Sequence, residues 1–394
     1  MSGALTLTNS GTILGGNGGE GNFIGHAGNG GDGIGSGGEG GSGGGNSGSG
    51  GAITGAITLN NQVGGVVQGG NGAGTSSGGV GVRGADVSIV NNGTIAGGFN
   101  GYGGQANAIV FASGTNSLEL WRNSLITGNV VAAPGGSDTL ILGGSDDSDL
   151  HLDDIGPGQQ YQNFANFQKT GTSNWTLNGT TTEAMPWTVS AGSLVLGSGS
   201  SMGAASTVQV NAGATLDVMG PDAYTLQSLA NNGSVMVQGP LTVGSYAGGA
   251  SAAPGEILLL ADLTSGNGTA FYPLTVTGTA SGVTRVDVYN VNAASASAPT
   301  TGDGILLITT ATPAAGSFVL GSVIDILTLA PITAYHYALV QGTDADAVHW
   351  YLRATQPRGG TAANATAVPA LDMAGLGLLA LLLAGAAMGM RRKG

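Results

Sequence analysis

Glycine is the feature that most limits the folds open to this chain, because 78 of its 394 residues are glycine. Glycine loses more backbone freedom on folding than any other residue, and many glycines make a helix interior unstable. Yet 41% of the residues are hydrophobic, which is too many for a chain that stays disordered. Short strands joined by tight turns satisfy both conditions. The composition therefore predicts an all-β protein.

A degenerate repeat occupies residues 1–112. Its units are LTLTNSGTILGGNGG from Leu5, ITLNNQVGGVVQGGNGAG from Ile57 and VSIVNNGTIAGGFNGYGG from Val87. Each unit has an alternating strand, an Asn-rich turn, a second short strand and a Gly-Gly pair. Asn and Gly accept the left-handed backbone that a sharp corner needs. Residues 15–51 are rich in Gly and Ser, and we expect a flexible insertion among these early coils.

Strand signals recur through residues 113–253. Examples are LELW from Leu118, SLVLG from Ser193 and VMVQG from Val235. One such strand cannot bury its apolar face alone, whereas stacked coils can, each covering the next. We therefore expect a β-solenoid with Val, Leu and Ile in its lumen. A sandwich or a barrel is the alternative, but the Asn-Gly and Asn-Ala-Gly corners favour coiling.

The sequence pattern changes over residues 254–355, where glycine is scarcer and the predicted strands are longer. YHYALVQG and VHWYLRA flank a GTDADA turn and predict an antiparallel hairpin. An open solenoid end exposes unpaired strand edges, so an aromatic hairpin could cap it. His336 and His349 fall on this hairpin, where they could face each other in a structural role. Residues 356–367 form a polar linker.

The last segment, residues 368–394, reads VPALDMAGLGLLALLLAGAAMGMRRKG. The run from Met373 to Met390 is 18 residues without a charge, long enough as a helix to cross most of a bilayer core. Arg391, Arg392 and Lys393 would hold its end at the cytoplasmic side. We expect one C-terminal transmembrane helix, with the preceding residues on the far side of the membrane.

The excess of acidic residues argues against two classes of partner for the body of the protein. The chain has 22 acidic and nine basic residues, and three of the basic ones are in the tail. Nucleic acids and anionic membrane surfaces need basic patches, so neither is expected to bind the body. The chain has no cysteine, which is compatible with export through an oxidising periplasm. Residues 1–5 have no signal-peptide pattern, and we expect the natural start to lie further upstream.

Several segments resemble a known family. GGSDTLILGG at 135–144, YQNFANFQKTGTSNWTLNGTTT at 161–182 and TVSAGSLVLGSGSSM at 188–202 resemble the passenger repeats of bacterial autotransporters. TTGDGILLI at 300–308, with the two hairpin segments, resembles the end of a pertactin-like passenger. The resemblance covers roughly residues 85–355 and implies a right-handed parallel β-helix. In that family a β-barrel follows the passenger, and we expect the short tail to stand in its place here.

The tail resembles a sorting signal. Val368, Pro369, Ala370 and Leu371 stand where the IPTL-type relatives of the Pro-Glu-Pro C-terminal signals have Ile-Pro-Thr-Leu, and the apolar run and Arg391, Arg392 and Lys393 follow. This resemblance implies that an exosortase-like membrane protease recognises the tail and cleaves near the motif. The alternative is a plain C-terminal anchor helix.

Few residues form patterns typical of a catalytic or metal-binding site. The Asp-rich turns GGSD and GGSDDSD are similar to a calcium-binding nonapeptide, which makes Asp138, Asp146, Asp147 and Asp149 weak candidates for Ca²⁺ ligands. A solvated acidic turn is the simpler interpretation. No histidines have metal-ligand spacing, and Gly-x-Ser-x-Gly occurs only within Gly/Ser runs. We expect no catalytic residue, no resident metal and no cofactor.

These observations favour a non-enzymatic protein exported to the surface of a Gram-negative cell. A stiff solenoid of structural or adhesion type would be displayed there, and its faces would contact an unknown ligand. Two alternatives stay open. One is a carbohydrate-active β-helix enzyme, which would need clustered acidic side chains in a groove on one face. The other is a degenerate autotransporter passenger with a simple membrane anchor.

Overall fold

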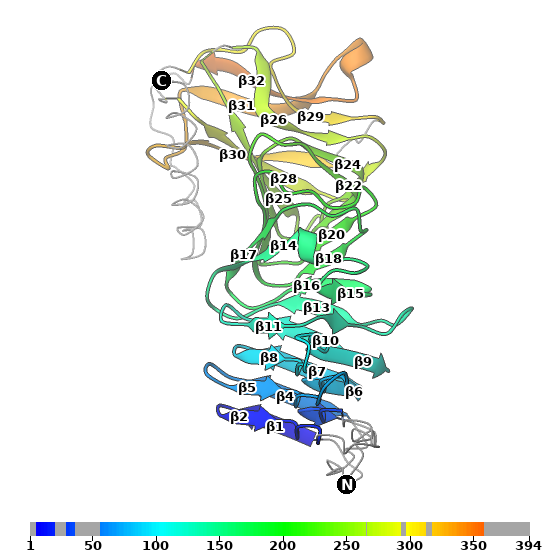
Figure 1. Cartoon of the computed structure of the whole chain (residues 1–394). Coiled ribbons are helices and arrows are strands. Elements are labelled where there is room, and N and C mark those ends of the chain that lie inside the picture. The colour runs from blue at the N-terminus through cyan, green and yellow to red at the C-terminus, as the bar shows by residue number, and fades with distance from the viewer. Residues whose placement is uncertain are drawn as a thin grey trace.

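The computed structural model describes residues 5–19, 29–35, 56–264, 266–292, 297–312 and 317–357. Within these ranges the regular structure is β, apart from single 3-10 turns at Leu152–Asp154 and Asp344–Asp346. The strands stack along one axis, from the N-terminal end to the C-terminal end (Figure 1). The expected all-β class is therefore confirmed.

The first turns of the chain contribute one strand to each of three sheets. Every third strand joins the same sheet in parallel, so β1 pairs with β4, and β4 with β7. The strands are β1 (Leu5–Asn9), β2 (Thr12–Leu14), β3 (Ile34–Gly35), β4 (Ile57–Asn61), β5 (Val66–Gln68), β6 (Val82–Ala85), β7 (Val87–Asn91), β8 (Thr94–Ala96), β9 (Ile109–Ser113), β10 (Ser117–Leu120), β11 (Leu125–Thr127) and β12 (Val130–Val131).

The coil changes shape over β13 (Thr139–Leu142), β14 (Ser148–His151) and β15 (Tyr161–Gln162). From there most strands alternate between two sheets. The 15-stranded sheet, here the long sheet, continues through β16, β18, β20, β22, β24, β26 and β29, while β14 begins an eight-stranded sheet. This connectivity is compatible with a β-solenoid.

The bounds of these later strands are β16 (Asn166–Lys169), β17 (Asn174–Asn178), β18 (Pro186–Val189), β19 (Gly192–Leu196), β20 (Thr207–Val210), β21 (Ala214–Met219), β22 (Tyr224–Asn231), β23 (Ser234–Gln238), β24 (Leu241–Ala247), β25 (Gly255–Ala261), β26 (Gly268–Val276), β27 (Ala280–Ser281), β28 (Thr284–Asn290), β29 (Ile305–Thr310) and β30 (Phe318–Asp325).

The core is a continuous lumen enclosed by the sheets. In β4, Ile57 and Leu59 are fully buried while Thr58 and Asn60 are exposed, which is the period of two expected for a strand with one wet face. Buried Val, Leu and Ile side chains from successive turns form one cluster along the stack. Each square ångström of apolar surface removed from water stabilises the fold by about 25 cal/mol. Because a turn buries its apolar face mainly against the turns above and below it, most of this stabilisation comes from its neighbours.

An antiparallel hairpin ends the long sheet, as its sequence predicts. β31 (Tyr335–Gln341) pairs with β32 (Trp350–Pro357), and β32 pairs antiparallel with β29. The ring of Trp350 packs edge-on against Phe318, with centroids 5.6 Å apart. The hairpin therefore covers the last parallel strand of the long sheet with a strand of opposite direction.

The idea that His336 and His349 face each other is wrong. Tyr335 lies opposite Pro357, and Gln341 lies opposite Trp350. Both histidines lie near the start of a strand, and strand starts are at opposite ends of an antiparallel hairpin. The two side chains are therefore held apart by the length of β31.

A ladder of buried asparagines holds the first corner of the coil. Asn9 Nδ2 donates to Asn61 Oδ1 at 2.8 Å, and Asn61 Nδ2 donates to Asn91 Oδ1 at 2.8 Å. Asn91 in turn donates to Ser124 Oγ at 3.0 Å. Asn61 and Asn91 are fully buried. Because buried amides must be hydrogen-bonded, these residues set the register between turns as well as the corner geometry.

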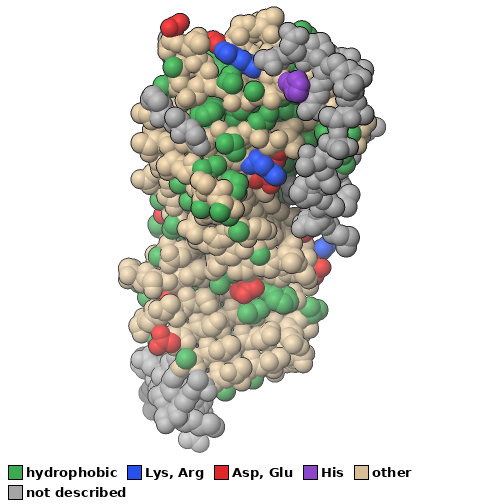
Figure 2. All heavy atoms as spheres, turned by 180° about the vertical axis from the view of Figure 1, so that it is seen from behind, with side chains coloured by type: hydrophobic (Ala, Val, Ile, Leu, Met, Phe, Trp, Pro, Cys, Tyr) green, Lys and Arg blue, Asp and Glu red, His purple; other side chains and the backbone are tan. Residues whose placement is uncertain are grey.

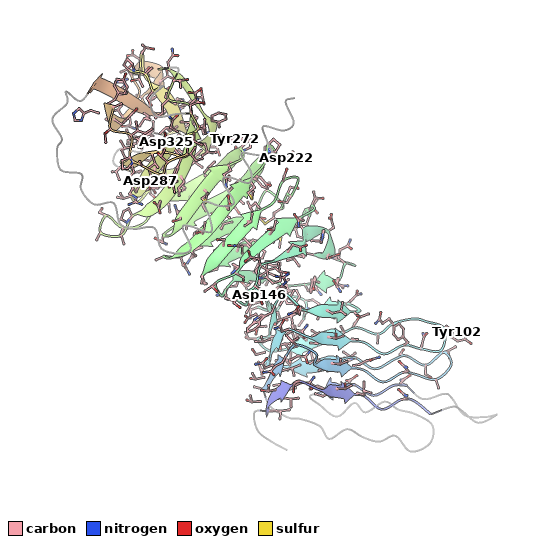
Figure 3. The ribbon with its side chains drawn as sticks, turned by 90° about the vertical axis from the view of Figure 1, so that its left-hand side faces the viewer. Tyr102, Asp146, Asp222, Tyr272, Asp287 and Asp325 are labelled. Atoms are coloured by element: carbon pink, nitrogen blue, oxygen red, sulfur yellow. The ribbon has the colours of Figure 1, made fainter. Side chains whose placement is uncertain are left out.

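Glycine-rich arms leave the coil between its second and third sheets. They project to one side of the early turns, with Tyr102 at a tip (Figure 3). Backbone bonds link arm to arm: Gly31 N donates to Gly16 O at 2.7 Å, Gly70 N to Gly31 O at 2.8 Å, and Gly98 N to Gly79 O at 2.8 Å. The arms comprise residues 15–19, 29–33, 69–81 and 97–107.

Close backbone contact explains the glycines of these arms. A Cβ atom added to Gly98 would lie 2.0 Å from the carbonyl oxygen of Gly70, where no side chain fits. Residues 29–35 belong to this arrangement, although they lie inside the segment predicted to be a flexible insertion, and Ile34–Gly35 pairs with Val82–Arg83. At these positions the glycines therefore indicate closely packed backbone and not a flexible insertion.

We predict that Asn61→Ala lowers the free energy of unfolding of the early turns by about 3 kcal/mol, since it removes the two ladder bonds with Asn9 and Asn91 and the buried bonds of Asn61 Nδ2 to the carbonyls of Gly65 and Thr94. Amide hydrogen exchange of β4 and β7 would measure the loss. Asn60→Ala is the matched control, because Asn60 is exposed on the same strand, and its effect should stay within about 0.5 kcal/mol. Equal effects of the two substitutions would contradict the ladder.

Candidate functional site

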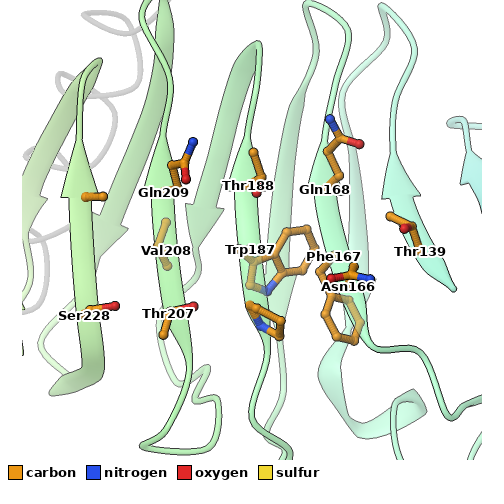
Figure 4. A pocket seen from close by; sticks show the side chains of 12 residues that line it. Thr139, Asn166, Phe167, Gln168, Trp187, Thr188, Thr207, Val208, Gln209 and Ser228 are labelled. Carbon is orange, nitrogen blue, oxygen red and sulfur yellow. The ribbon is translucent and has the colours of Figure 1, made fainter. Parts of the chain in front are cut away.

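A shallow depression of about 430 Å³ crosses five strands of the long sheet, from β13 to β22. We call it the polar trough. Two rows of side chains project from these strands, away from the lumen (Figure 4). Parallel pairing in register aligns the rows, because Thr139 lies opposite Asn166, Gln168 opposite Thr188, and Thr188 opposite Gln209. The rows comprise Thr139, Asn166, Pro186, Thr207 and Ser228, and Gln168, Thr188, Gln209 and Ala230.

The lining of the trough is uncharged and mixed: hydroxyls and carboxamides line it together with Pro186 and Ala230, over a floor that includes Phe167, Trp187 and Val208. Among the described residues that line it, none is acidic or basic. Gln168 donates its amide to Ser190 Oγ at 2.9 Å, Gln209 donates to Asn211 Oδ1 at 2.9 Å, and Asn166 donates to the carbonyl of Ser137 at 3.1 Å. These bonds orient the carboxamides. The trough can accept and donate hydrogen bonds, but it offers no group for acid–base catalysis at neutral pH.

A second depression, of about 550 Å³, lies beside the 3-10 turn that follows β14. Asp153 and Glu183 both line it, together with a run of threonines. Asp153 Oδ1 already accepts hydrogen bonds from the backbone and hydroxyl of Thr180, at 3.2 and 3.4 Å. Two carboxylates therefore line one hollow, which is the feature that the enzyme alternative requires.

The predicted calcium ligands have different environments. Asp138 is fully buried and accepts hydrogen bonds from Asn116 N at 2.9 Å and Ala133 N at 3.2 Å. Asp146, Asp147 and Asp149 are exposed, and Asp147 accepts from the backbone of Asn174 at 2.7 Å. No group of three or more Asp, Glu or His side chains placed to hold a metal occurs within the described ranges. Asp138 and Asp147 thus link neighbouring turns through hydrogen bonds to their backbones.

The remaining charged side chains are sparse, and on the face seen in Figure 2 they are few and separated. One cluster escaped the sequence analysis: Arg285 bonds to Glu256 and lies 3.1 Å from Asp287 Oδ2. Burial raises the pKa of Asp287 to about 7, and the proximity of Glu256 adds to the rise. Burial opposes ionisation of Glu256, but hydrogen bonds from Asp287 and Arg285 outweigh it and lower the pKa.

Only strand register reveals this cluster. Glu256 lies opposite Arg285 in adjacent parallel strands, and Asp287 follows two residues later on the same face. The next outward positions are apolar: Met236, Tyr289 and Ile326 form a small cluster outside the lumen. The cluster of charges is therefore set into an apolar surface, which explains the shifted pKa values. The sequence signal was the alternation in GEILLLADL and GVTRVDVYNV, but their alignment was not predictable.

Lys169 is a buried cation at the end of β16. Its ammonium group donates to the carbonyls of Thr170, Gly171 and Ala191, the last two at 3.2 Å. Burial lowers the pKa of Lys169 to about 8, although Asp147 and Glu119 oppose the shift. A lysine tied to three carbonyls in a closed corner acts as a structural bracket between turns.

The predicted tail lies outside the described residues, including Val368–Leu371, Met373–Met390 and Arg391–Lys393. Within the ranges described, no helix has the length and hydrophobicity needed to cross a bilayer.

We predict that Lys169 contributes a rise in the stability of the body between about pH 8 and pH 10, measured as the difference in pH slope between the unchanged chain and Lys169→Met; the raised pKa of buried tyrosines such as Tyr246 opposes the rise near pH 10 equally in both. In that window the unfolded chain keeps a proton that the folded chain has released, so the free energy of unfolding increases by up to about 2 kcal/mol. Urea unfolding at several pH values measures it. The other lysine of the chain supplies the control: Lys393→Met should leave the slope unchanged. An equal slope in Lys169→Met and in the unchanged chain would contradict the assignment.

Compared with models of known protein families and with curated proteins, the chain matches none.

Proposed function

We propose that this chain is an exported bacterial cell-surface protein of structural or adhesion type. Its body would be a right-handed parallel β-helix, because connections between parallel strands of one sheet are nearly always right-handed. Its tail, residues 368–394, would sort or anchor it at the membrane, through an exosortase-like protease or as a plain anchor helix. The mechanism is display: a stiff body holds its contact faces away from the cell.

The stacked body is the observation that carries the proposal. Strands pair along the long sheet from β1 to β29, and the lumen is filled by apolar side chains, aliphatic in the early turns and joined by aromatic ones such as Trp175, Trp187 and Tyr246 further along. Such a body is stiff along its axis because bending it would open backbone pairs and lumenal contacts together. A rod of this kind suits a spacer or a contact surface better than a lid-gated catalytic cleft.

The chemistry of the outer faces supports a non-enzymatic function. The polar trough has hydroxyls and carboxamides but no acid or base among its described lining residues. The cluster of Glu256, Arg285 and Asp287 is internally paired and half-buried. The trough thus offers a binding surface, and the carboxylates of the charged cluster are occupied by Arg285.

The alternative of a carbohydrate-active enzyme is favoured by one observation, the depression that Asp153 and Glu183 both line. Two carboxylates in a hollow are the minimum equipment for glycoside hydrolysis. Asp153, however, is engaged by Thr180.

We predict that the surface-exposed form has lost the end of its tail. Cleavage near Val368–Leu371 would remove the apolar run and the basic end, and intact-mass spectrometry of the surface fraction would detect the loss of residues after the motif. Pro369→Ala should slow the cleavage, whereas Pro357→Ala, outside the motif, should leave it unchanged. If the protein at the surface has its full-length mass, the tail is a simple anchor and not a sorting signal. Recovery of the protein only from the cytoplasm would refute surface display.

We also predict that the protein releases no reducing sugar from neutral or acidic polysaccharides, because the trough has no acid–base pair and Asp153 is engaged. A reducing-end assay on the purified full chain measures this. Release that disappears in Glu183→Gln and persists in Glu119→Gln, which lies outside the depression, would establish the enzyme alternative.

A further inference from the structure

We infer that the polar trough binds an uncharged polysaccharide chain, which lies across the strands of the long sheet. This inference rests on the proposed function and specifies the ligand of the displayed face. It concerns binding at a different site from the depression lined by Asp153 and Glu183.

The chemistry of the lining selects the ligand. Thr139, Thr188 and Ser228 present hydroxyls, which both donate and accept hydrogen bonds. The N–H groups of Gln168 and Gln209 donate to Ser190 and Asn211, which fixes each carboxamide with its oxygen available as an acceptor. A ligand that matches this face must carry many groups able to donate and accept, with no formal charge. Sugar hydroxyls have this property.

The geometry of the lining selects a polymer. The trough crosses β13, β16, β18, β20 and β22, and adjacent strands lie about 4.8 Å apart, so it extends for roughly 19 Å. The side chains repeat with that spacing along each row. One hexose unit of an extended glycan is about as long as one strand spacing, so successive units meet successive members of each row, most of which are polar.

Other ligand classes fit poorly. The chain has a net charge of −13, which repels nucleic acids and acidic polysaccharides. A lipid would require an apolar lining. A peptide added as a strand would require an open sheet edge, whereas each of the three central strands of the trough pairs with a neighbour on both sides. The trough is therefore a contact surface for side chains, and its ligand does not join the sheet.

We expect one trough to bind the polysaccharide weakly, and many copies displayed on one cell to bind it strongly. Hydrogen bonds between neutral groups on an open surface exchange with water, so each contributes little. Many copies on one cell raise the effective affinity for a polymer that can engage several of them. Because no charges take part, the affinity should depend little on salt, unlike attachment through charged groups.

Affinity electrophoresis of the purified full chain tests the inference, with cellohexaose-type β-glucan, mannan and dextran as neutral probes and polygalacturonate as the anionic probe. We expect retardation by at least one neutral probe, unchanged between 50 mM and 500 mM salt, and none by polygalacturonate. The double variant Gln168→Leu, Gln209→Leu should bind that probe roughly tenfold more weakly, as the loss of two hydrogen-bonding groups predicts.

The matched control is Gln227→Leu, since Gln227 is exposed on β22 and does not line the trough. It should bind as the unchanged chain does, and circular dichroism should show that all variants are folded. Retardation by no neutral probe, equal retardation by polygalacturonate, or equal binding by the double variant and the control would each overturn the inference. None of these outcomes depends on the tail. The intact mass of the surface fraction therefore tests the proposed surface display independently of sugar binding.

Discussion

Pairing between successive turns of the chain is the interaction on which the rest of the structure depends. A turn here is too short to bury its own apolar face, so its strands become stable only when the turn above and the turn below pair with them. The lumen, the asparagine ladder, the bracket formed by Lys169 and the rows of the polar trough all exist because the pairs are in register. A slip of one residue would move lumenal side chains outward. Register is therefore both a stability term and the source of the outer surface.

Buried polar groups are how this chain specifies register. Hydrophobic contacts in the lumen tolerate exchange among Val, Leu and Ile, so they discriminate poorly between neighbouring registers. An amide ladder such as Asn9, Asn61 and Asn91 accepts one alignment only, since any other leaves amides unpaired in the interior. Lys169 adds a similar constraint where the coil changes from three sheets to two.

Much of the architecture could be predicted from alternation and turn chemistry. The all-β class, the aliphatic lumen and the terminal hairpin all follow from local patterns that each strand carries itself. The change in coil shape near β15 could not be predicted, because it depends on how many residues each corner spans. The trough and the cluster of Glu256, Arg285 and Asp287 were equally hidden: each joins residues of different turns, and no local pattern records which residues become neighbours. His336 and His349 were misjudged for a different reason: they lie on one hairpin, but its register places them at opposite ends of β31.

The glycine-rich arms have a consequence for how such a chain can vary. They are joined to one another through their backbones, as the contacts of Gly31, Gly70 and Gly98 show, and the lumenal cluster contains no residue of the described segments 69–81 or 97–107. Residues can therefore be gained or lost at an arm's tip without altering the number of lumenal positions in a turn. Natural variants of this protein are free to differ in arm length while keeping an identical spine, so the lateral reach of the molecule can evolve independently of its height.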